Sequence, residues 1–465
     1  MEIKLEDKYK LSKGTRFLTG AQALVRVPIV QARRDKQKNL NTACYISGYR
    51  GSPLGGYDQQ ILKNKKYLNE NNIFFQPGIN EELAATSLWG TQQVNLRKQD
   101  KYDGVFGIWY GKGPGVDRAG DALKHVNLAG TSKFGGVIAL MGDDHICESS
   151  TTSHQSEFAM IDAMIPFFNP SGVQEILDYG IIGIELSRKS GCWVGIKCVH
   201  DNVSSGATVD LDENRLNLLD ISNEKYPPDG LNIRLKDTAQ EKEYRLHHHK
   251  IKYVKEFCKL NSLNKLIFDS ENPKVGIIST GKSFLDTKLG LEKIGINEDV
   301  ANQVGIKFLK IAMPWPLEET IIEKFSENLE KIIVVEEKRS IIETQVKEIL
   351  FNKNLNVKVV GKKDENNNDL FVSSGALDPG EIGLKIFGII NYLNLPDEVH
   401  NLSKKLRSLK EKTNSNISLK RVPHFCSGCP HNTSTRIPEG SRAITGISCA
   451  YLVEHMERDN EGFSQ

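Results

Sequence analysis

Three cysteines late in the chain have the spacing of a metal or redox site. Cys426 and Cys429 form a Cys-x-x-Cys pair in CSGCPH, and Cys449 follows in GISCAY. An iron–sulfur cluster usually takes four thiolates, so this set would lack one ligand. A structural zinc site also prefers four ligands, and His424 or His431 could supply the fourth. We therefore predict metal ligation by the three cysteines. An iron–sulfur cluster and zinc are both open as the metal, and cysteines that bind nothing are the alternative.

A second candidate group is a carboxylate at the start of a predicted helix, in PGINEELAATSLWG. Asn80 is a favoured N-cap residue, and acidic residues in a first turn complement the helix dipole, so capping alone explains the pattern. A general acid–base role for Glu81 is the competing interpretation. Glu82 faces another side of the helix, and we expect it to be a solvated acid.

Two cations and a glycine turn complete the candidate site. SGYRGSPLGG follows a predicted strand, and Gly48 and Gly51 indicate a tight turn around Arg50. The guanidinium of Arg50 could bind a substrate carboxylate through two hydrogen bonds, whereas the alternative is a surface arginine. Lys112, in GKGPGVDR, is a weaker candidate for the same role.

One motif imitates a nucleotide-binding loop. GIISTGKS, from Gly276 to Ser283, matches G-x-x-x-x-G-K-[ST], and the later IIVVEE resembles a strand that ends in a magnesium-binding acid. A phosphate loop needs a strand before its first glycine, but SENPK stands there. Ile277 and Ile278 must then lie inside the strand. We predict a strand, a turn at Gly281 and a helix from about Ser283, and no ATPase.

These residues would be positioned by alternating strands and helices. TACYISGY, GVFGIWY, GGVIALMGDDH and GCWVGIKCV have the β-branched and aromatic content of buried strands, and helical segments separate them. This alternation predicts an α/β fold with a parallel sheet covered on both faces, whose ligands lie at the carboxyl ends of the strands. KVGIIST, GIKFLKI and KIIVVEE predict a second α/β unit. The HHH of RLHHHK cannot converge on one ion from a helix, and we expect a solvated face.

Composition excludes some classes of function. The chain has 465 residues and a net charge of +2 from 61 basic and 59 acidic residues. Two or three domains are expected at this length, and the charge balance gives no reason to expect nucleic-acid or membrane binding. The charged N-terminal sequence has no apolar segment typical of a signal peptide. We therefore expect a cytoplasmic protein with mostly reduced cysteines.

Five phrases resemble a known family. GTRFLTGAQALVRVPIVQARRD, ISGYRGSPLGGYD, YDGVFGIWYGKGPGVDRAGDALKHVNLAGTS, MGDDHICESSTTSHQSE and FCSGCPHNTSTRIPEGSRA together, in this order, resemble the fused bacterial indolepyruvate ferredoxin oxidoreductases. The resemblance covers the whole chain. It implies a thiamine diphosphate-binding fold with a transketolase C-terminal-like domain. The implied ranges are a pyrimidine-type domain (1–235), a helical connector (236–268), a transketolase C-terminal-like domain (269–392), a linker helix (393–420) and the start of a diphosphate-type domain (421–465).

The resemblance also implies chemistry. Glu81 would lie against N1′ of the thiamine aminopyrimidine, where a carboxyl group favours the tautomer that removes the C2 proton. Contacts to the cofactor would come from Asn80, Gly48, Gly51 and Ser52. The implied reaction oxidises a 2-oxo acid such as indolepyruvate to an acyl-coenzyme A, with ferredoxin as the acceptor. It would use Mg²⁺ and a [4Fe-4S] cluster held by the cysteines, in a homo-oligomer.

Besides the missing fourth cysteine, the sequence lacks a motif that the family carries. Members carry a Gly-Asp-Gly motif and a following Asn for the Mg²⁺ of the diphosphate, but GDDH at residues 142–145 is not that motif. We therefore expect an N-terminal portion of such an enzyme that is inactive alone. The alternatives are a thiamine-dependent decarboxylase that needs neither ferredoxin nor coenzyme A, and a non-catalytic subunit-interaction module.

Overall fold

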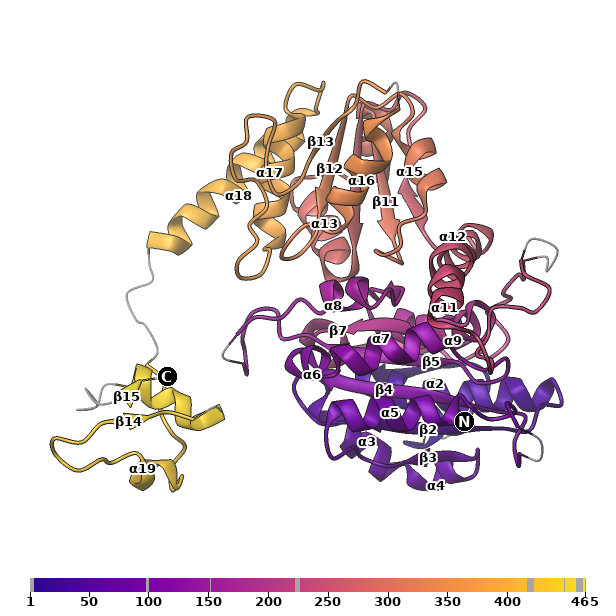
Figure 1. The fold of residues 1–465 in the computed structure, drawn as a ribbon. Coiled ribbons are helices and arrows are strands. Elements are labelled where there is room, and N and C mark those ends of the chain that lie inside the picture. The colour runs from indigo at the N-terminus through magenta and orange to yellow at the C-terminus, as the bar shows by residue number, and fades with distance from the viewer. Residues whose placement is uncertain are drawn as a thin grey trace.

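The computed structural model has two α/β units and a small C-terminal segment (Figure 1). It describes the following residues: 4–97, 100–150, 152–221, 226–353, 355–415, 422–446, 448–456 and 463–464. We call residues 4–221 the first unit and residues 265–415 the second unit. A helical connector, residues 239–260, lies between them in sequence. The C-terminal segment, residues 422–464, lies apart from both units in Figure 1.

The first unit is built on a six-stranded sheet in which every strand pairing is parallel. Its spatial order is β3 (Ile73–Phe75), β2 (Thr42–Gly48), β4 (Gly104–Lys112), β5 (Val137–Gly142), β7 (Val194–Cys198) and β6 (Phe167–Phe168). The central strands are buried because helices cover both faces, as expected for a parallel sheet. The predicted α/β fold with a parallel sheet is confirmed.

Two apolar clusters mark the two faces of this sheet. One holds α2 (Gly20–Gln37), α3 (Tyr57–Lys63) and α9 (Val173–Ser190). The other holds α5 (Glu81–Thr91), α6 (Gly113–Arg118), α7 (Gly120–Ala129) and α8 (Glu157–Asp162). The remaining elements of the unit are α1 (Asp7–Lys10), η1 (Leu54–Gly56), α4 (Lys65–Asn69), α10 (His200–Val203) and an antiparallel pair, β1 (Thr15–Thr19) and β8 (Gly206–Asp210).

The connector is helical and packs against the first unit. It comprises α11 (Ala239–Arg245), a π-helical turn η3 (Leu246–Lys250) and α12 (Ile251–Leu260). Its apolar residues, such as Phe257, belong to the larger core of the first unit. His247 and His248 are exposed, and no metal-binding group of His, Cys, Asp or Glu occurs among the residues described. The expected solvated histidine face is confirmed at these two positions.

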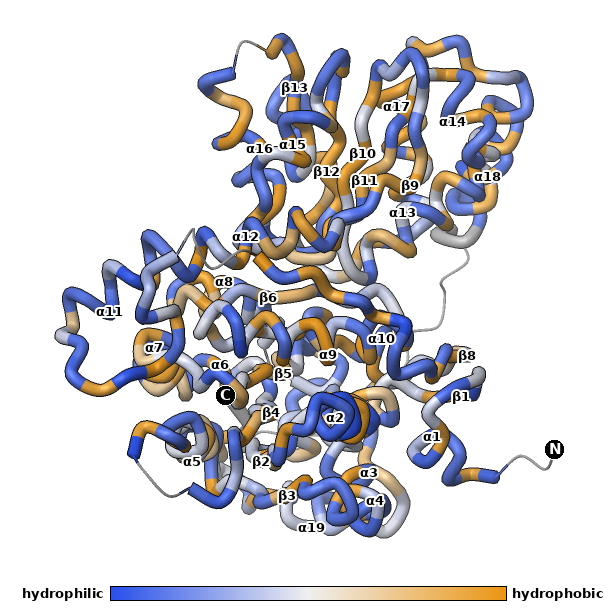
Figure 2. The backbone as a smooth tube through the Cα atoms, turned by 90° about the vertical axis from the view of Figure 1, so that its right-hand side faces the viewer, coloured by the Kyte–Doolittle hydropathy of each residue, from blue (hydrophilic) through white to orange (hydrophobic). Residues whose placement is uncertain are grey.

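The second unit contains a five-stranded sheet with apolar strands (Figure 2). Its order is β13 (Lys358–Val360), β12 (Lys331–Val335), β10 (Val275–Thr280), β11 (Ile306–Ile311) and β9 (Lys265–Phe268). Only β9 is antiparallel to its neighbour in this sheet. The helices are α13 (Gly281–Lys293), α14 (Glu298–Val304), α15 (Glu319–Ser326), α16 (Ile342–Phe351), α17 (Pro379–Ile390) and α18 (Asp397–Ser415).

The segment that matches a nucleotide-binding loop lies in β10 and at the start of α13. Ile277 and Ile278 are fully buried within β10, in the core clusters on either side of the second sheet. The helix α13 begins at Gly281, so no loop of phosphate-binding length lies between strand and helix. The predicted strand and helix are confirmed, but the helix begins at Gly281, about two residues before the predicted start, so Gly281 belongs to the helix and not to a separate turn.

The C-terminal segment contains short elements. These are α19 (His431–Ser434), η4 (Ser448–His455) and a parallel pair, β14 (Ala443–Ile444) and β15 (Phe463–Ser464). Across the described part of the whole chain, none of the helices has the length and apolar character that crossing a bilayer requires.

A close helix crossing in the second unit gives a stability prediction. A Cβ added at Gly290 of α13 would lie 2.5 Å from the Pro379 carbonyl oxygen at the start of α17. Because that atom is backbone, the helices must separate, and we expect Gly290→Ala to lower the free energy of unfolding by about 1–3 kcal/mol. Gly388→Ala is the control, since nothing lies within 4 Å of its added Cβ. Denaturant unfolding that ranks Gly388→Ala as the more damaging change would contradict this packing.

Candidate functional site

The candidate site lies at the carboxyl edge of the first sheet. Because the strands are parallel, the residues that follow β2, β4, β5 and β7 meet at this edge. The predicted site residues Arg50 and Ser52 follow β2, and Lys112 ends β4. The sheet also brings there a loop after β5, which starts at Asp143.

Glu81 is fixed at the N-terminus of α5. Asn80 is the N-cap, and its side-chain oxygen accepts a hydrogen bond from the Leu83 N–H at 2.8 Å. The Trp109 indole Nε1–H of β4 donates to the Glu81 carbonyl at 2.9 Å. Glu82 is exposed, as the sequence predicts. Asn80 therefore has a demonstrated capping role, and its predicted contact to a cofactor stays a prediction.

The Glu81 side chain crosses the glycine-rich start of α6. A Cβ on Gly115 would lie 2.3 Å from Glu81 Oε1, and one on Gly111 would lie 3.3 Å from Glu81 Cγ. The carboxyl group is half-buried and has no hydrogen-bond or ion-pair partner among the described residues. A half-buried carboxyl without a partner fits the role of binding a polar ring atom of a cofactor.

The turn after β2 needs its glycines. A Cβ at Gly48 would lie 2.1 Å from the Tyr110 carbonyl oxygen, which accepts the Tyr49 N–H at 3.1 Å. A Cβ at Gly51 would lie 2.8 Å from Cβ of Lys112. The turn thus packs closely against the end of β4. The predicted residues Gly48, Gly51 and Lys112 lie together there.

The two residues predicted to bind the substrate, Arg50 and Lys112, differ in exposure and in hydrogen bonding. The Arg50 side chain is 73% exposed, and its Nε lies 3.6 Å from Oδ2 of the buried Asp58. The Lys112 ammonium donates to the Ser149 carbonyl at 2.9 Å, which ties it to the loop after β5. Arg50 is therefore the better placed of the two to meet an incoming carboxylate.

The loop after β5 is organised by Asp144. Its carboxylate accepts the N–H groups of Glu148 and Ser149, each at 2.8 Å, and the Ser150 hydroxyl at 2.6 Å. Partial burial would raise the pKa of Asp144, but these hydrogen bonds outweigh it and lower the pKa. Asp144 therefore stays ionised and holds the loop against Lys112. Ser52 lies close by, in a small pocket that Asp144 also lines.

A buried ionic cluster beside this edge was missed from the sequence. Lys197 of β7 forms an ion pair with Glu157, both are nearly fully buried, and Asp143 lies next to them. Burial, and then the Glu157 charge, raise the pKa of Asp143 to about 7. A lysine inside the apolar strand WVGIKCV was the available signal, because a buried lysine requires a carboxylate partner.

This cluster predicts a pH-dependent difference in stability. The pKa of Asp143 rises on folding from 3.8 to about 7, so the folded state binds more protons between these values. Stability from this group is therefore lost as the pH rises through that window. Asp143→Asn imitates the protonated acid and does not titrate. We therefore expect the free energy of unfolding of Asp143→Asn, minus that of the original protein, to be larger at pH 8 than at pH 4 by an amount on the order of a few kcal/mol. Parallel stability curves from pH 4 to 8 would refute this.

The predicted metal ligands are not assembled. Cys426 and Cys449 are exposed and Cys429 is half-buried, and the Cys429 sulfur lies 3.3 Å from Nδ1 of His431. No group of three His, Cys, Asp or Glu side chains with metal-binding geometry occurs in the part of the chain that the structure describes. The residues as placed do not fit a cluster, and metal ligation by these cysteines stays a prediction.

Comparisons with known proteins agree with this architecture. The family model described as "Indolepyruvate oxidoreductase domain" matches residues 265–416. The chain is 27% identical over 428 residues to indolepyruvate oxidoreductase subunit IorA of Pyrococcus abyssi, covering 90% of this chain and 58% of that protein. It is 24% identical over 430 residues to the same subunit of Methanothermobacter marburgensis, covering 92% and 61%. The chain thus spans less than two thirds of the length of these relatives.

A solved structure shares the fold. The 2-oxoglutarate:ferredoxin oxidoreductase of Magnetococcus marinus, solved with 2-oxoglutarate, coenzyme A and succinyl-CoA bound, superposes with a TM-score of 0.58 at 13% sequence identity. The match covers 81% of this chain and 66% of that chain. At this identity the similarity supports the fold assignment alone.

Proposed function

We propose that the chain is a member of the indolepyruvate oxidoreductase family and forms part of a thiamine diphosphate-dependent oxidoreductase that acts on 2-oxo acids. The observation that carries the proposal is the Glu81 carboxyl. It is fixed at a helix start, half-buried and without a hydrogen-bond or ion-pair partner in the described part of the chain, at the strand edge where α/β sheets bind ligands.

In this proposal each residue of the edge has a task. Thiamine diphosphate, when bound, supplies an electron-accepting ring for cleavage of the bond next to a 2-oxo group. Glu81 holds a proton at N1′ of the pyrimidine, and Gly48, Gly51 and Ser52 allow close approach to the cofactor. Arg50 binds the substrate carboxylate, with Lys112 in support. The pyrimidine-type, connector, transketolase-like and diphosphate-type ranges predicted above are part of the same proposal.

The finer identity of the reaction is proposed from the family. The substrate is an aryl pyruvate such as indolepyruvate, the acyl group passes to coenzyme A, and ferredoxin accepts the electrons. Mg²⁺ binds the diphosphate, and Cys426, Cys429 and Cys449 contribute to an iron–sulfur cluster. The assembly contains further copies or subunits. Since residues 1–465 contain no Gly-Asp-Gly sequence, we expect this polypeptide by itself to be inactive.

An anaerobic assay tests the proposal. The assembled enzyme, including whatever chain supplies the diphosphate site, is supplied with indolepyruvate, thiamine diphosphate and Mg²⁺. We expect reduction of a viologen dye that depends on coenzyme A. Release of an aldehyde without dye reduction would instead establish the decarboxylase alternative. Absence of both reactions, with thiamine diphosphate unbound, would favour a subunit-interaction module.

A further inference from the structure

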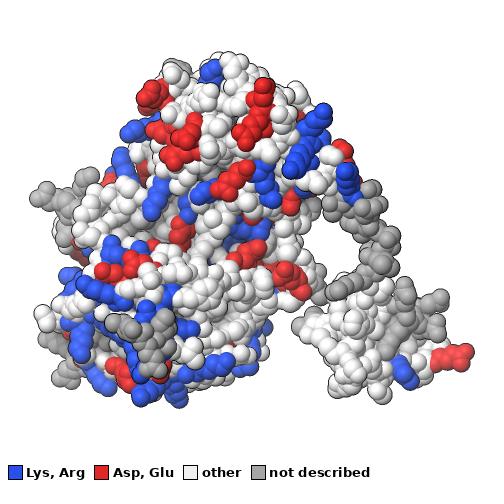
Figure 3. Space-filling model, turned by 180° about the vertical axis from the view of Figure 1, so that it is seen from behind, with Lys and Arg blue, Asp and Glu red and all other residues white. Residues whose placement is uncertain are grey.

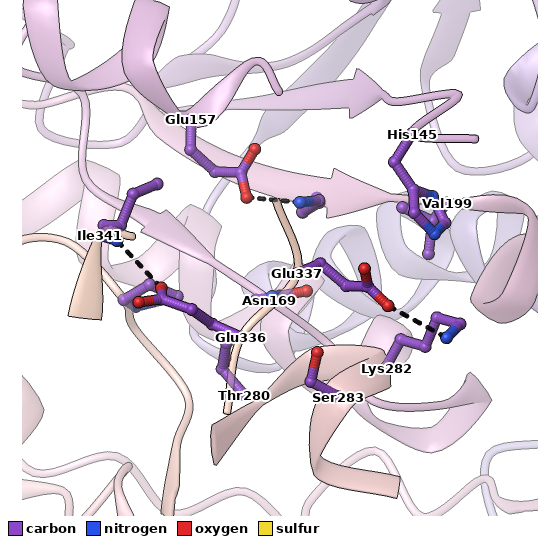
Figure 4. A pocket seen from close by; sticks show the side chains of 12 residues that line it. His145, Glu157, Asn169, Val199, Thr280, Lys282, Ser283, Glu336, Glu337 and Ile341 are labelled. Atoms are coloured by element: carbon purple, nitrogen blue, oxygen red, sulfur yellow. Dashed lines mark hydrogen bonds and ion pairs between the residues drawn. The ribbon is translucent and has the colours of Figure 1, made fainter. Parts of the chain in front are cut away.

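A cavity at the junction of the two units is lined by charged groups that the proposed reaction does not use. His145, Glu157 and Lys197 come from the first unit, whereas Lys282 and Glu337 come from the second. The units meet there directly, since the Asn169 N–H donates to the Ala312 carbonyl at 3.0 Å. Figure 4 shows the Glu157 and Glu337 carboxyl groups on opposite sides of this space. Acidic and basic side chains are interspersed over the face of the molecule that Figure 3 shows.

Three buried polar atoms of the lining lack a hydrogen-bond partner among the described residues. They are Glu157 Oε2, Glu337 Oε2 and His145 Nε2. His145 is 3% exposed and Glu157 is 6% exposed, so bulk water does not satisfy them. Unpartnered buried polar atoms are costly, and several around one cavity indicate a bound group that satisfies them.

The cations of the cavity, in contrast, are already paired. Lys197 forms an ion pair with Glu157 through Oε1, which leaves Oε2 free. The Lys282 ammonium donates to Asp286 Oδ2 at 2.5 Å and to Glu337 Oε1 at 3.2 Å. Glu337 Oε1 also accepts the Leu377 N–H at 3.1 Å. The unused hydrogen-bonding capacity of the cavity therefore belongs to acceptor atoms, and two of these acceptors are carboxylate oxygens.

The neighbouring groups favour a cation over an anion. Glu336 adds a third carboxylate to the lining, and it accepts the N–H groups of residues 341, 342 and 343, each at 3.0 Å. An anion would face all three carboxylates. Burial, and then the Lys197 charge, lower the pKa of His145, so its neutral ring has one nitrogen able to accept a hydrogen bond.

We propose that this cavity binds an ammonium-type cation, either the ammonium ion or a primary alkylammonium group, which donates to Glu157, Glu337 and His145. A tetrahedral N–H donor suits acceptors that come from separate elements. The described residues hold no group of three side chains with metal-binding geometry, which disfavours a divalent metal ion. Because the acceptors come from both units, the cation would hold the two units together.

Thermal unfolding of the purified protein tests the proposal. Ammonium chloride or methylammonium chloride replaces tetramethylammonium chloride at constant ionic strength, since tetramethylammonium has no N–H donor. We expect a saturable rise in the unfolding midpoint of about 1.5 °C near ten times the dissociation constant. A rise with ammonium alone assigns the free ion, and an equal or larger rise with methylammonium assigns an alkylammonium group. Potassium chloride that matches ammonium would overturn the hydrogen-bond-donor chemistry.

Variants locate the effect. Glu337→Gln leaves Lys282 its partner Asp286 but removes one free carboxylate oxygen, and His145→Leu removes the ring acceptor. We expect the ammonium-dependent shift to disappear in both variants. Glu343→Gln is the control, because Glu343 is a buried carboxylate of the second unit that does not line the cavity. If no salt has a specific effect on the original protein, the cavity holds only water and the proposal is wrong. If one variant fails to fold, the other decides.

Discussion

Glu81→Gln should reduce turnover of the assembled enzyme by about 10²-fold or more, the usual scale of acid–base assistance. Glutamine keeps the shape of the side chain and leaves the Asn80 cap and the Trp109 contact to the Glu81 backbone intact. Only the ionisable proton is lost. We therefore expect kcat to fall while the unfolding midpoint stays unchanged, as measured by steady-state dye reduction and thermal unfolding.

Glu82→Gln is the matched control for this prediction. Glu82 is the next residue of the same helical turn but is exposed, so its replacement should leave turnover within about twofold of the original. If the two variants lost activity equally, the charge of the first helical turn would be responsible and Glu81 would have no special role.

Gly115→Ala should also reduce turnover, because it displaces the Glu81 carboxyl group without changing its chemistry. The added Cβ would lie 2.3 Å from Glu81 Oε1, which is the mobile end of a side chain, so Glu81 moves and the backbone does not. A displacement of about 1 Å in a catalytic group costs up to roughly 10²-fold in rate, and we expect a loss of 10-fold to 10²-fold. The measurement is kcat for dye reduction by the assembled enzyme.

Gly120→Ala controls for a change of glycine in this region. It lies at the start of α7, and nothing is within 4 Å of its added Cβ. Its activity should equal that of the original protein. Full activity of Gly115→Ala would mean that the Glu81 carboxyl does not need its observed position.

The parallel sheets could be predicted because their strands are locally distinctive. The apolar strand at Val137–Gly142 and the alternation with helices identify the fold without tertiary information. The short β6, at Phe167–Phe168, and the antiparallel edge strand β9 were not predicted. They exist because of neighbours distant in sequence; for example, the Phe167 N–H donates to the Trp315 carbonyl at 3.0 Å.

The candidate site was predictable only where a motif lies within one loop. The glycine turn at residues 48–51 and the helix start at Glu81 fall in this class. The buried Lys197–Glu157 pair joins residues from separate elements, and the cavity that holds Glu337 joins two units, so neither leaves a local pattern. GDDH is not a magnesium motif, and nothing local in it indicates that Asp143 is buried and therefore has a raised pKa.

Exchange of the C2 proton of thiamine diphosphate for deuterium tests the role of Glu81 most directly. In the assembled enzyme with Mg²⁺, quenched samples followed by proton NMR report this step without substrate, ferredoxin or coenzyme A. We predict that Glu81→Gln binds thiamine diphosphate with an affinity within a few-fold of the original but exchanges the proton at least about 10²-fold more slowly. Equal exchange rates in the two proteins, with the cofactor bound in both, would contradict the assignment of Glu81.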